Sequence, residues 1–175
     1  MAYNPETFAN KYEAALNRIA SLYQRTIDSG AGVNQLLVAI GNIDFKDLIE
    51  NELGFNRELN NVAQSYVDAL RDMDGFADVD ESVLRALVES DLNIYRSKFD
   101  DTYVQMKSLF TESVVNGLPR EAFVDALTKG QAGVLSPFQA KSLYTDSIAK
   151  FNRSVMKQMA ENAPANTMFI YTGPI

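Results

Sequence analysis

The 175-residue sequence contains neither cysteine nor histidine. Without cysteine the chain can form no disulfide, no thiolate zinc site and no thiol nucleophile. Without histidine it lacks the commonest general base and the usual imidazole metal ligand. The catalytic groups that the composition still allows are carboxylate pairs and a desolvated lysine. We therefore expect a protein that is not an enzyme and that uses no metal or other cofactor.

Long apolar runs are also missing. No stretch approaches the roughly 18 uninterrupted apolar residues that suggest a membrane-spanning helix. The N-terminus, MAYNPETFANKYEAAL, lacks the basic and then apolar stretches of a secretory signal. Hydrophobic residues nevertheless make up 46% of the chain, which is enough for a buried core. These features predict a soluble protein that does not associate with a membrane.

Basic residues are fewer than acidic ones, and the net charge differs between the two parts of the chain. Residues 1–117 contain 10 Lys and Arg against 19 Asp and Glu, a net charge of −9, whereas residues 118–175 contain 6 against 4, a net charge of +2. This asymmetry indicates two parts that face different surroundings. We expect an acidic helical bundle in 1–117 and a C-terminal helical segment in 118–175. An acidic surface repels nucleic acid, so sequence-specific nucleic-acid binding is not expected.

The spacing of apolar residues predicts an all-α chain. The first helix is expected from Pro5 to about Ser29, with Asn4 as its capping residue and apolar side chains at steps of three or four. Glycine, proline and capping side chains mark the bounds of the other helices. These are expected at 33–40, 42–54, 56–73, 119–129 and 137–162.

One expected helix is much longer than the others and runs from about Glu81 to Asn116, between the capping residue Asp80 and Gly117. Its apolar residues form an 11-residue repeat, which corresponds to about 3.67 residues per turn. Such a helix would span about 54 Å, so we expect an elongated bundle in which other helices lie antiparallel to this central one. The repeat comprises Leu84, Val88, Leu92, Tyr95, Phe99, Tyr103, Met106, Phe110 and Val114.

The acidic stretch at 72–81, DMDGFADVDE, invites comparison with a calcium-binding loop. The EF-hand loop requires glycine at its sixth position and a carboxylate at its twelfth. Counted from Asp72, Gly75 is fourth and Val83 is twelfth, so the pattern fails. The stretch is interpreted as a solvated turn before the long helix.

A single β-like run, TMFIYT, occupies 167–172. A lone strand leaves its backbone N–H and C=O groups unpaired, so it should pair with more of its own chain, a second copy or another protein. Phe169 and Tyr171 would then give this strand addition its specificity.

Three basic residues, Lys150, Arg153 and Lys157, recur at steps of three and four on the last expected helix, with Lys141 farther up the same helix. They could anchor an acidic partner or phosphate groups. They could equally be a solvated face, because cations are favourable near a helix C-terminus. Together with Phe169 and Tyr171, these three residues are the candidate partner-binding residues.

Three motifs in the C-terminal third carry a family resemblance: Tyr144-Thr145-Asp146, Phe151-Asn152-Arg153, and FIYTGP at 169–174. They resemble the Mu-type phage minor head proteins, also called head morphogenesis proteins. In that family a helix with a Thr–acidic pair and a downstream Asn precedes a strand that ends in Tyr-x-Gly. The family pattern continues with an Asp, a Thr-Arg or Ser-Arg pair and a Cys. This chain ends at Ile175, so the resemblance implies the N-terminal portion of a longer protein.

The resemblance implies a structural component of the virion, located at the head or portal region and in the host cytoplasm during assembly. Its expected partners are the portal or other head proteins, with self-association as a further option. A helical adaptor or regulatory protein that binds a partner helix in a groove is the alternative. An unusual enzyme that uses carboxylates or lysine is a third hypothesis.

Overall fold

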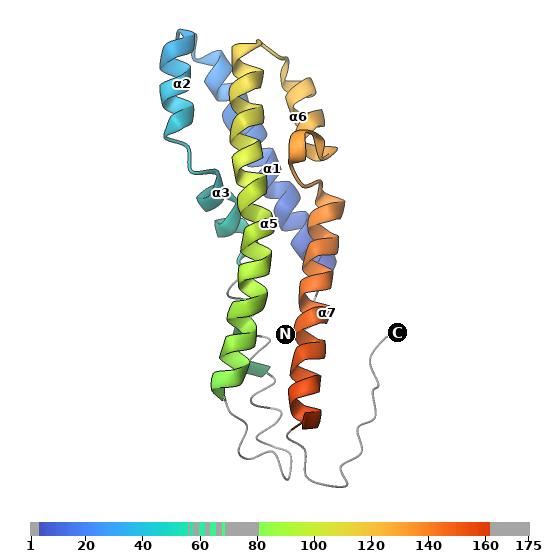
Figure 1. Ribbon diagram of the computed structural model, residues 1–175. Helices are drawn as coiled ribbons and strands as arrows, with labels where there is room; N and C mark the ends of the chain where they lie inside the picture. The colour runs from blue at the N-terminus through green and yellow to red at the C-terminus, as the bar shows by residue number, and fades with distance from the viewer. Residues whose placement is uncertain are drawn as a thin grey trace.

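A computed structural model describes residues 4–55 and 81–161, together with residues 57, 60, 61, 64, 65 and 68. The regular elements in these residues are helices, and no strand occurs among them, which confirms the all-α class. In chain order, the elements are α1 (Pro5–Asp28), α2 (Val33–Gly41), α3 (Phe45–Leu53), α5 (Glu81–Val115), α6 (Arg120–Thr128), a 3-10 turn (Gln131–Gly133) and α7 (Pro137–Glu161) (Figure 1).

Some expected features lie outside the described residues. They are most of the acidic turn, the capping residue Asp80, and the strand at 167–172 with Phe169 and Tyr171. Within the helix expected at 56–73, the six described residues are helical.

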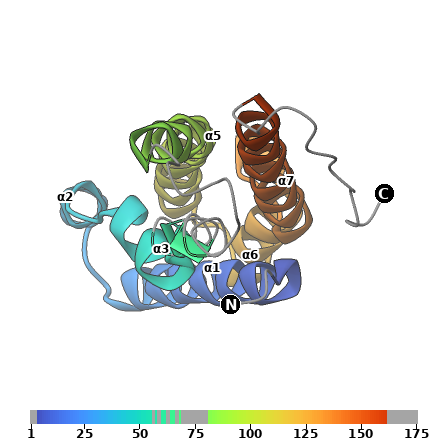
Figure 2. The same ribbon diagram turned by 90° about the horizontal axis from the view of Figure 1, so that it is seen from below.

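The long helix α5 is continuous over 35 residues and forms the axis of an elongated bundle, as the sequence predicted (Figure 1). The chain direction in α2, α6 and α7 is opposite to that in α5. Seen from below, α5 and α7 stand side by side and α1 lies across both (Figure 2). The expected antiparallel arrangement therefore fails for α1, which crosses obliquely because its one apolar stripe packs against both neighbours.

Local hydrogen bonds set the beginnings of the helices. At α1, the Asn4 Oδ1 atom accepts from the backbone N–H groups of Glu6 (3.0 Å) and Thr7 (3.2 Å). At α3, the Asp44 carboxylate accepts from the backbone N–H of Asp47 at 2.9 Å. Such bonds satisfy backbone donors that have no partner inside a helix, which is why the sequence marked these bounds correctly.

Two tyrosines of α1 donate hydrogen bonds to the linkers on either side of α6. Gly117, with φ of 62°, ends α5 in a left-handed turn in which the Leu118 N–H donates to the Ser113 carbonyl at 2.9 Å. The Tyr23 hydroxyl donates to the Leu118 carbonyl oxygen at 2.6 Å. The Tyr12 hydroxyl donates to the Leu135 carbonyl oxygen, 2.8 Å away, just before α7. Each hydroxyl thereby gains the partner that a buried polar group requires.

Aromatic rings fill the centre of the bundle. The Phe99 side chain is fully buried, and its ring centroid lies 4.5 Å from that of Tyr95, 5.8 Å from Tyr12, 5.9 Å from Tyr103 and 6.5 Å from Phe8. Tilted and edge-on ring pairs at these distances add stabilisation beyond the burial of area. The cluster therefore joins α1 to α5.

The predicted 11-residue repeat is the buried face of α5. Every member of the repeat whose side chain is described is buried: Val88, Leu92, Tyr95, Phe99, Tyr103, Met106, Phe110 and Val114. Residues of the expected C-terminal segment belong to the same core, among them Phe123, Tyr144 and Phe151. One hydrophobic core thus contains side chains from both of the segments that differ in charge.

We predict that Phe99→Ala will lower the free energy of unfolding by about 3–5 kcal/mol, because it removes the ring that four others contact and leaves a cavity. Urea denaturation followed by circular dichroism measures this change. Val104→Ala is the matched control, since Val104 lies on the same helix with 66% of its surface exposed. Its cost should stay below about 0.5 kcal/mol. Equal losses in the two variants would contradict the assignment of Phe99 to the core.

Candidate interaction site on the last helix

The last helix, α7, begins with a reciprocal capping arrangement. The Gln139 backbone N–H donates to the Ser136 Oγ atom at 3.3 Å, and the Ser136 backbone N–H donates to the Gln139 Oε1 atom at 2.8 Å. Pro137 occupies the first helical position, where its missing N–H has no cost. The sequence predicted this start of the helix.

The motif residues that carry the family resemblance divide between core and surface. Tyr144 is buried and stacks on Phe8 of α1, with ring centroids 4.2 Å apart. Phe151, two turns later, is fully buried. Asp146 and Arg153 are exposed. The described aromatic members of the motif, Tyr144 and Phe151, therefore stabilise the bundle, while its charged members are available to solvent.

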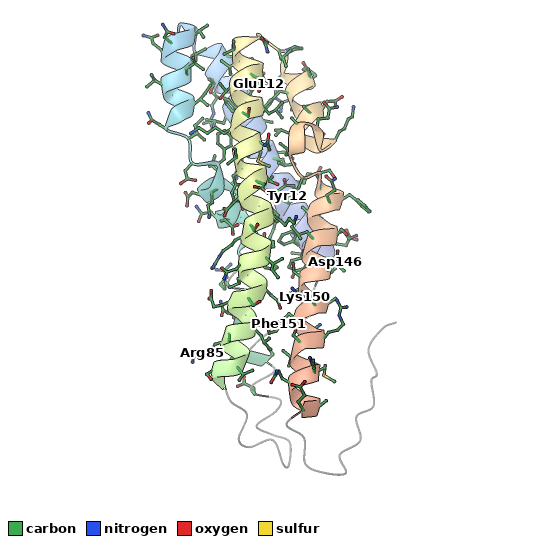
Figure 3. All side chains as sticks on the ribbon, viewed as in Figure 1. Tyr12, Arg85, Glu112, Asp146, Lys150 and Phe151 are labelled. Carbon is green, nitrogen blue, oxygen red and sulfur yellow. The ribbon has the colours of Figure 1, made fainter. Side chains whose placement is uncertain are left out.

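The exposed charges lie on one face of α7. Asp146, Lys150, Arg153 and Lys157 recur at steps of four, three and four, which places them in one stripe along the helix. Figure 3 labels Asp146 and Lys150 on this helix. Lys157 pairs with Glu161 at 3.7 Å, and both side chains are at least half exposed, so this pair contributes little to stability.

Lys150 differs from the other two candidate cations because it has a buried partner. Its Nζ atom lies 3.6 Å from the Oδ1 atom of Asp91 on α5, whose side chain is only 5% exposed. The other carboxylate oxygen of Asp91 has no hydrogen-bond partner among the described residues. Arg153 pairs with no carboxylate in the described part of the chain. Lys150 thus binds α7 to α5, and Arg153 and Lys157 form the more accessible part of the stripe.

Burial raises the pKa of the Asp91 carboxyl group above its ordinary value of 3.8, and the neighbouring Lys150 ammonium opposes the shift. A buried carboxylate without enough partners disfavours its charged form. Sequence reasoning missed Asp91, although its position gave a signal. It follows Val88 by three residues and precedes Tyr95 by four, so it falls on the apolar face of the long helix.

A metal site is not evident among the described residues. They contain no group of three or more acidic side chains that could bind a metal ion. Among the described helices, none combines the length and apolar character needed to cross a membrane. The site on α7 is therefore characterised by exposed charge and not by a convergent set of ligands.

We predict that Lys150→Gln will lower the free energy of unfolding at neutral pH by about 1–2 kcal/mol, because it leaves the buried Asp91 carboxylate without compensation. Lys157→Gln is the control and should cost less than about 0.5 kcal/mol. Denaturation curves at a series of pH values measure both.

The loss of stability caused by Lys150→Gln should depend on pH in a definite direction. The folded-state pKa of Asp91 is raised, so the folded protein takes up this proton before the unfolded chain does, as the pH falls toward 3.8. Once Asp91 is neutral, Lys150→Gln no longer leaves a buried charge. The deficit of the variant should shrink with falling pH, and a deficit that stayed constant would count against this pair.

No protein-family model matches the chain, and no curated protein or solved structure is significantly similar to it.

Proposed function

We propose that this chain is a structural protein of the phage head, of the Mu-type minor head class, and that it binds the portal or another head protein without catalysing a reaction. The observation that carries the proposal is the division of the family-like motif on α7. Its aromatic residues, Tyr144 and Phe151, hold α7 in the bundle, and its charged residues face outward. A motif of this kind both stabilises a helix and presents a surface to a partner.

The accessible cations give that surface a chemical preference. Arg153 and Lys157 are exposed near the C-terminal end of α7, in the part of the chain whose net charge is positive. An acidic patch on the partner would complement them, and complementary charges increase the rate and specificity of association. The acidic residues 1–117 would repel the same patch, which fixes the orientation of docking.

One observation favours the alternative, a helical adaptor that binds a partner helix. The α2 helix is rich in apolar residues, but only Ile40 among them is buried. Val33 and Val38 remain 50% and 68% exposed, and Val104 of α5 is 66% exposed. Exposed apolar surface often marks a protein interaction site. The two proposals therefore place the partner on different helices, and substitutions can separate them.

For the head-protein proposal, we predict that the double substitution Arg153→Glu with Lys157→Glu will weaken binding to the portal protein of the same phage by at least roughly tenfold, because it reverses two interface charges. The chain offers a closely matched control in Arg120→Glu with Lys129→Glu. Arg120 is an exposed arginine, and Lys129 pairs with Asp125 four residues earlier, as Lys157 pairs with a carboxylate four residues later. Surface plasmon resonance with purified portal measures both variants.

Three outcomes decide between the proposals. Loss of binding in the α7 double variant alone supports the head-protein proposal. Equal losses in both double variants would show that only net charge matters. If the intact chain does not bind portal, and a protein partner binds it but not a Val38→Asp variant, the adaptor becomes the better explanation.

A further inference from the structure

A polar hollow of about 560 Å³ lies beside α3 and α5, which pack against each other in the middle of the bundle (Figure 1). Three cations from separate parts of the sequence surround it: Lys46 of α3, Arg57, and Arg96 of α5. The other described residues that line it are Glu50, Asn51, Gly54 and Asn60. In residues 1–117 acidic side chains outnumber basic ones by 19 to 10, so a hollow lined by three cations is unusual for this part of the chain.

Two of the three cations are only weakly neutralised. The Lys46 Nζ atom lies 2.9 Å from the Asp100 Oδ1 atom, and both side chains are about half exposed. The Arg96 Nη1 atom lies 3.6 Å from the Glu89 Oε2 atom, with the Glu89 side chain 64% exposed. Exposed pairs of this kind contribute less than about 1 kcal/mol, so a better anion can compete with them.

Among the described residues that line the hollow, the one carboxylate, Glu50, already accepts a hydrogen bond. The Oε1 atom of Glu50 accepts a hydrogen bond from the buried Tyr103 hydroxyl at 2.6 Å. Glu50 therefore helps to satisfy a buried donor of the core. It forms no ion pair with Arg57, Lys46 or Arg96 in the described part of the chain.

Arg57 is the one of these three cations that has no carboxylate partner among the described residues. No carboxylate of the described residues lies within ion-pair distance of its guanidinium group. The group lies directly over Gly54, where an added Cβ atom would come within 3.3 Å of the Arg57 Nη2 atom. Gly54 ends α3 in a left-handed conformation, with φ of 59°, that favours glycine. The same residue thus ends the helix and leaves room for the guanidinium group at the edge of the hollow.

We propose that this hollow binds a doubly charged phosphate group, either inorganic phosphate or a phosphomonoester. Arginine offers a fork of N–H donors that matches phosphate oxygens, and lysine adds a point charge. Asn51 and Asn60 line the same space and carry further N–H donors in their side chains. Among the described residues, no aromatic side chain lines it to offer a platform on which a nucleobase could stack. This inference rests on residues other than those of the stripe on α7 and is independent of the proposed head function.

The test is a titration of the isotope-labelled full chain with inorganic phosphate at pH 8, followed by NMR, with sodium chloride at equal ionic strength as the reference. We expect saturable shifts of the Arg57 Nε–H signal and of the Asn51 side-chain amide. Arg57→Gln should weaken phosphate binding roughly tenfold, the loss expected for a charge-assisted hydrogen bond. Lys98→Gln is the control, because Lys98 is an exposed cation on α5 that lies about 200° around the helix from Arg96.

O-phosphoserine forms a second arm that distinguishes the two sources of the phosphate group. Binding at least as tight as that of inorganic phosphate supports a phosphomonoester, and much weaker binding supports the free anion. Chloride shifts equal to the phosphate shifts, shifts that do not saturate, or equal losses in Arg57→Gln and Lys98→Gln would each overturn the proposal. If a thermal melt shows that Arg57→Gln has unfolded, Arg96→Gln decides in its place, and unchanged affinity in that variant overturns the proposal.

Discussion

The arrangement of the bundle depends on the burial of α1 against two helices at once. Its aromatic residues reach α5 through Tyr12 and Phe99, and α7 through Phe8 and Tyr144. Burial raises the pKa of the Tyr12 hydroxyl, so this group stays neutral and needs only a hydrogen-bond acceptor. The carbonyl before α7 provides that acceptor. The side chains that fill the core therefore also position the linkers, and through them the exposed face of α7.

Much of this fold follows from neighbours in the sequence. The bounds of α1, α3 and α7 depend on capping bonds within a few residues, and the buried face of α5 depends on an 11-residue repeat, so both were predictable. The oblique path of α1 depends on ring contacts such as Phe8 with Tyr144, between residues 136 positions apart in the sequence. A pattern among neighbouring residues cannot predict a contact between rings so far apart in the sequence.

Some features of the candidate sites were likewise predictable from the sequence, and others were not. Helical spacing predicted that Lys150, Arg153 and Lys157 share a face. It could not predict that Lys150 meets a buried carboxylate, because this requires α5 and α7 to lie side by side at one register. The hollow at Arg57 was missed for the same reason, since its cations come together only when α3 packs on α5. Periodicity identifies the face of a helix, and tertiary packing decides which charges on it are paired.

The hydrogen bonds that Tyr12 and Tyr23 of α1 donate to the linkers on either side of α6 also determine when the chain can complete its fold. The Tyr12 hydroxyl and its acceptor are separated by 123 positions, and the Tyr23 hydroxyl and its acceptor by 95. A ribosome adds about 5–20 residues per second, so α1 waits roughly 6–25 seconds for the carbonyl that Tyr12 binds. The α1 side chains that pack on α7, such as Phe8 against Tyr144, lack these partners for that time. Completion of the bundle is therefore a late event that follows synthesis of the C-terminal half.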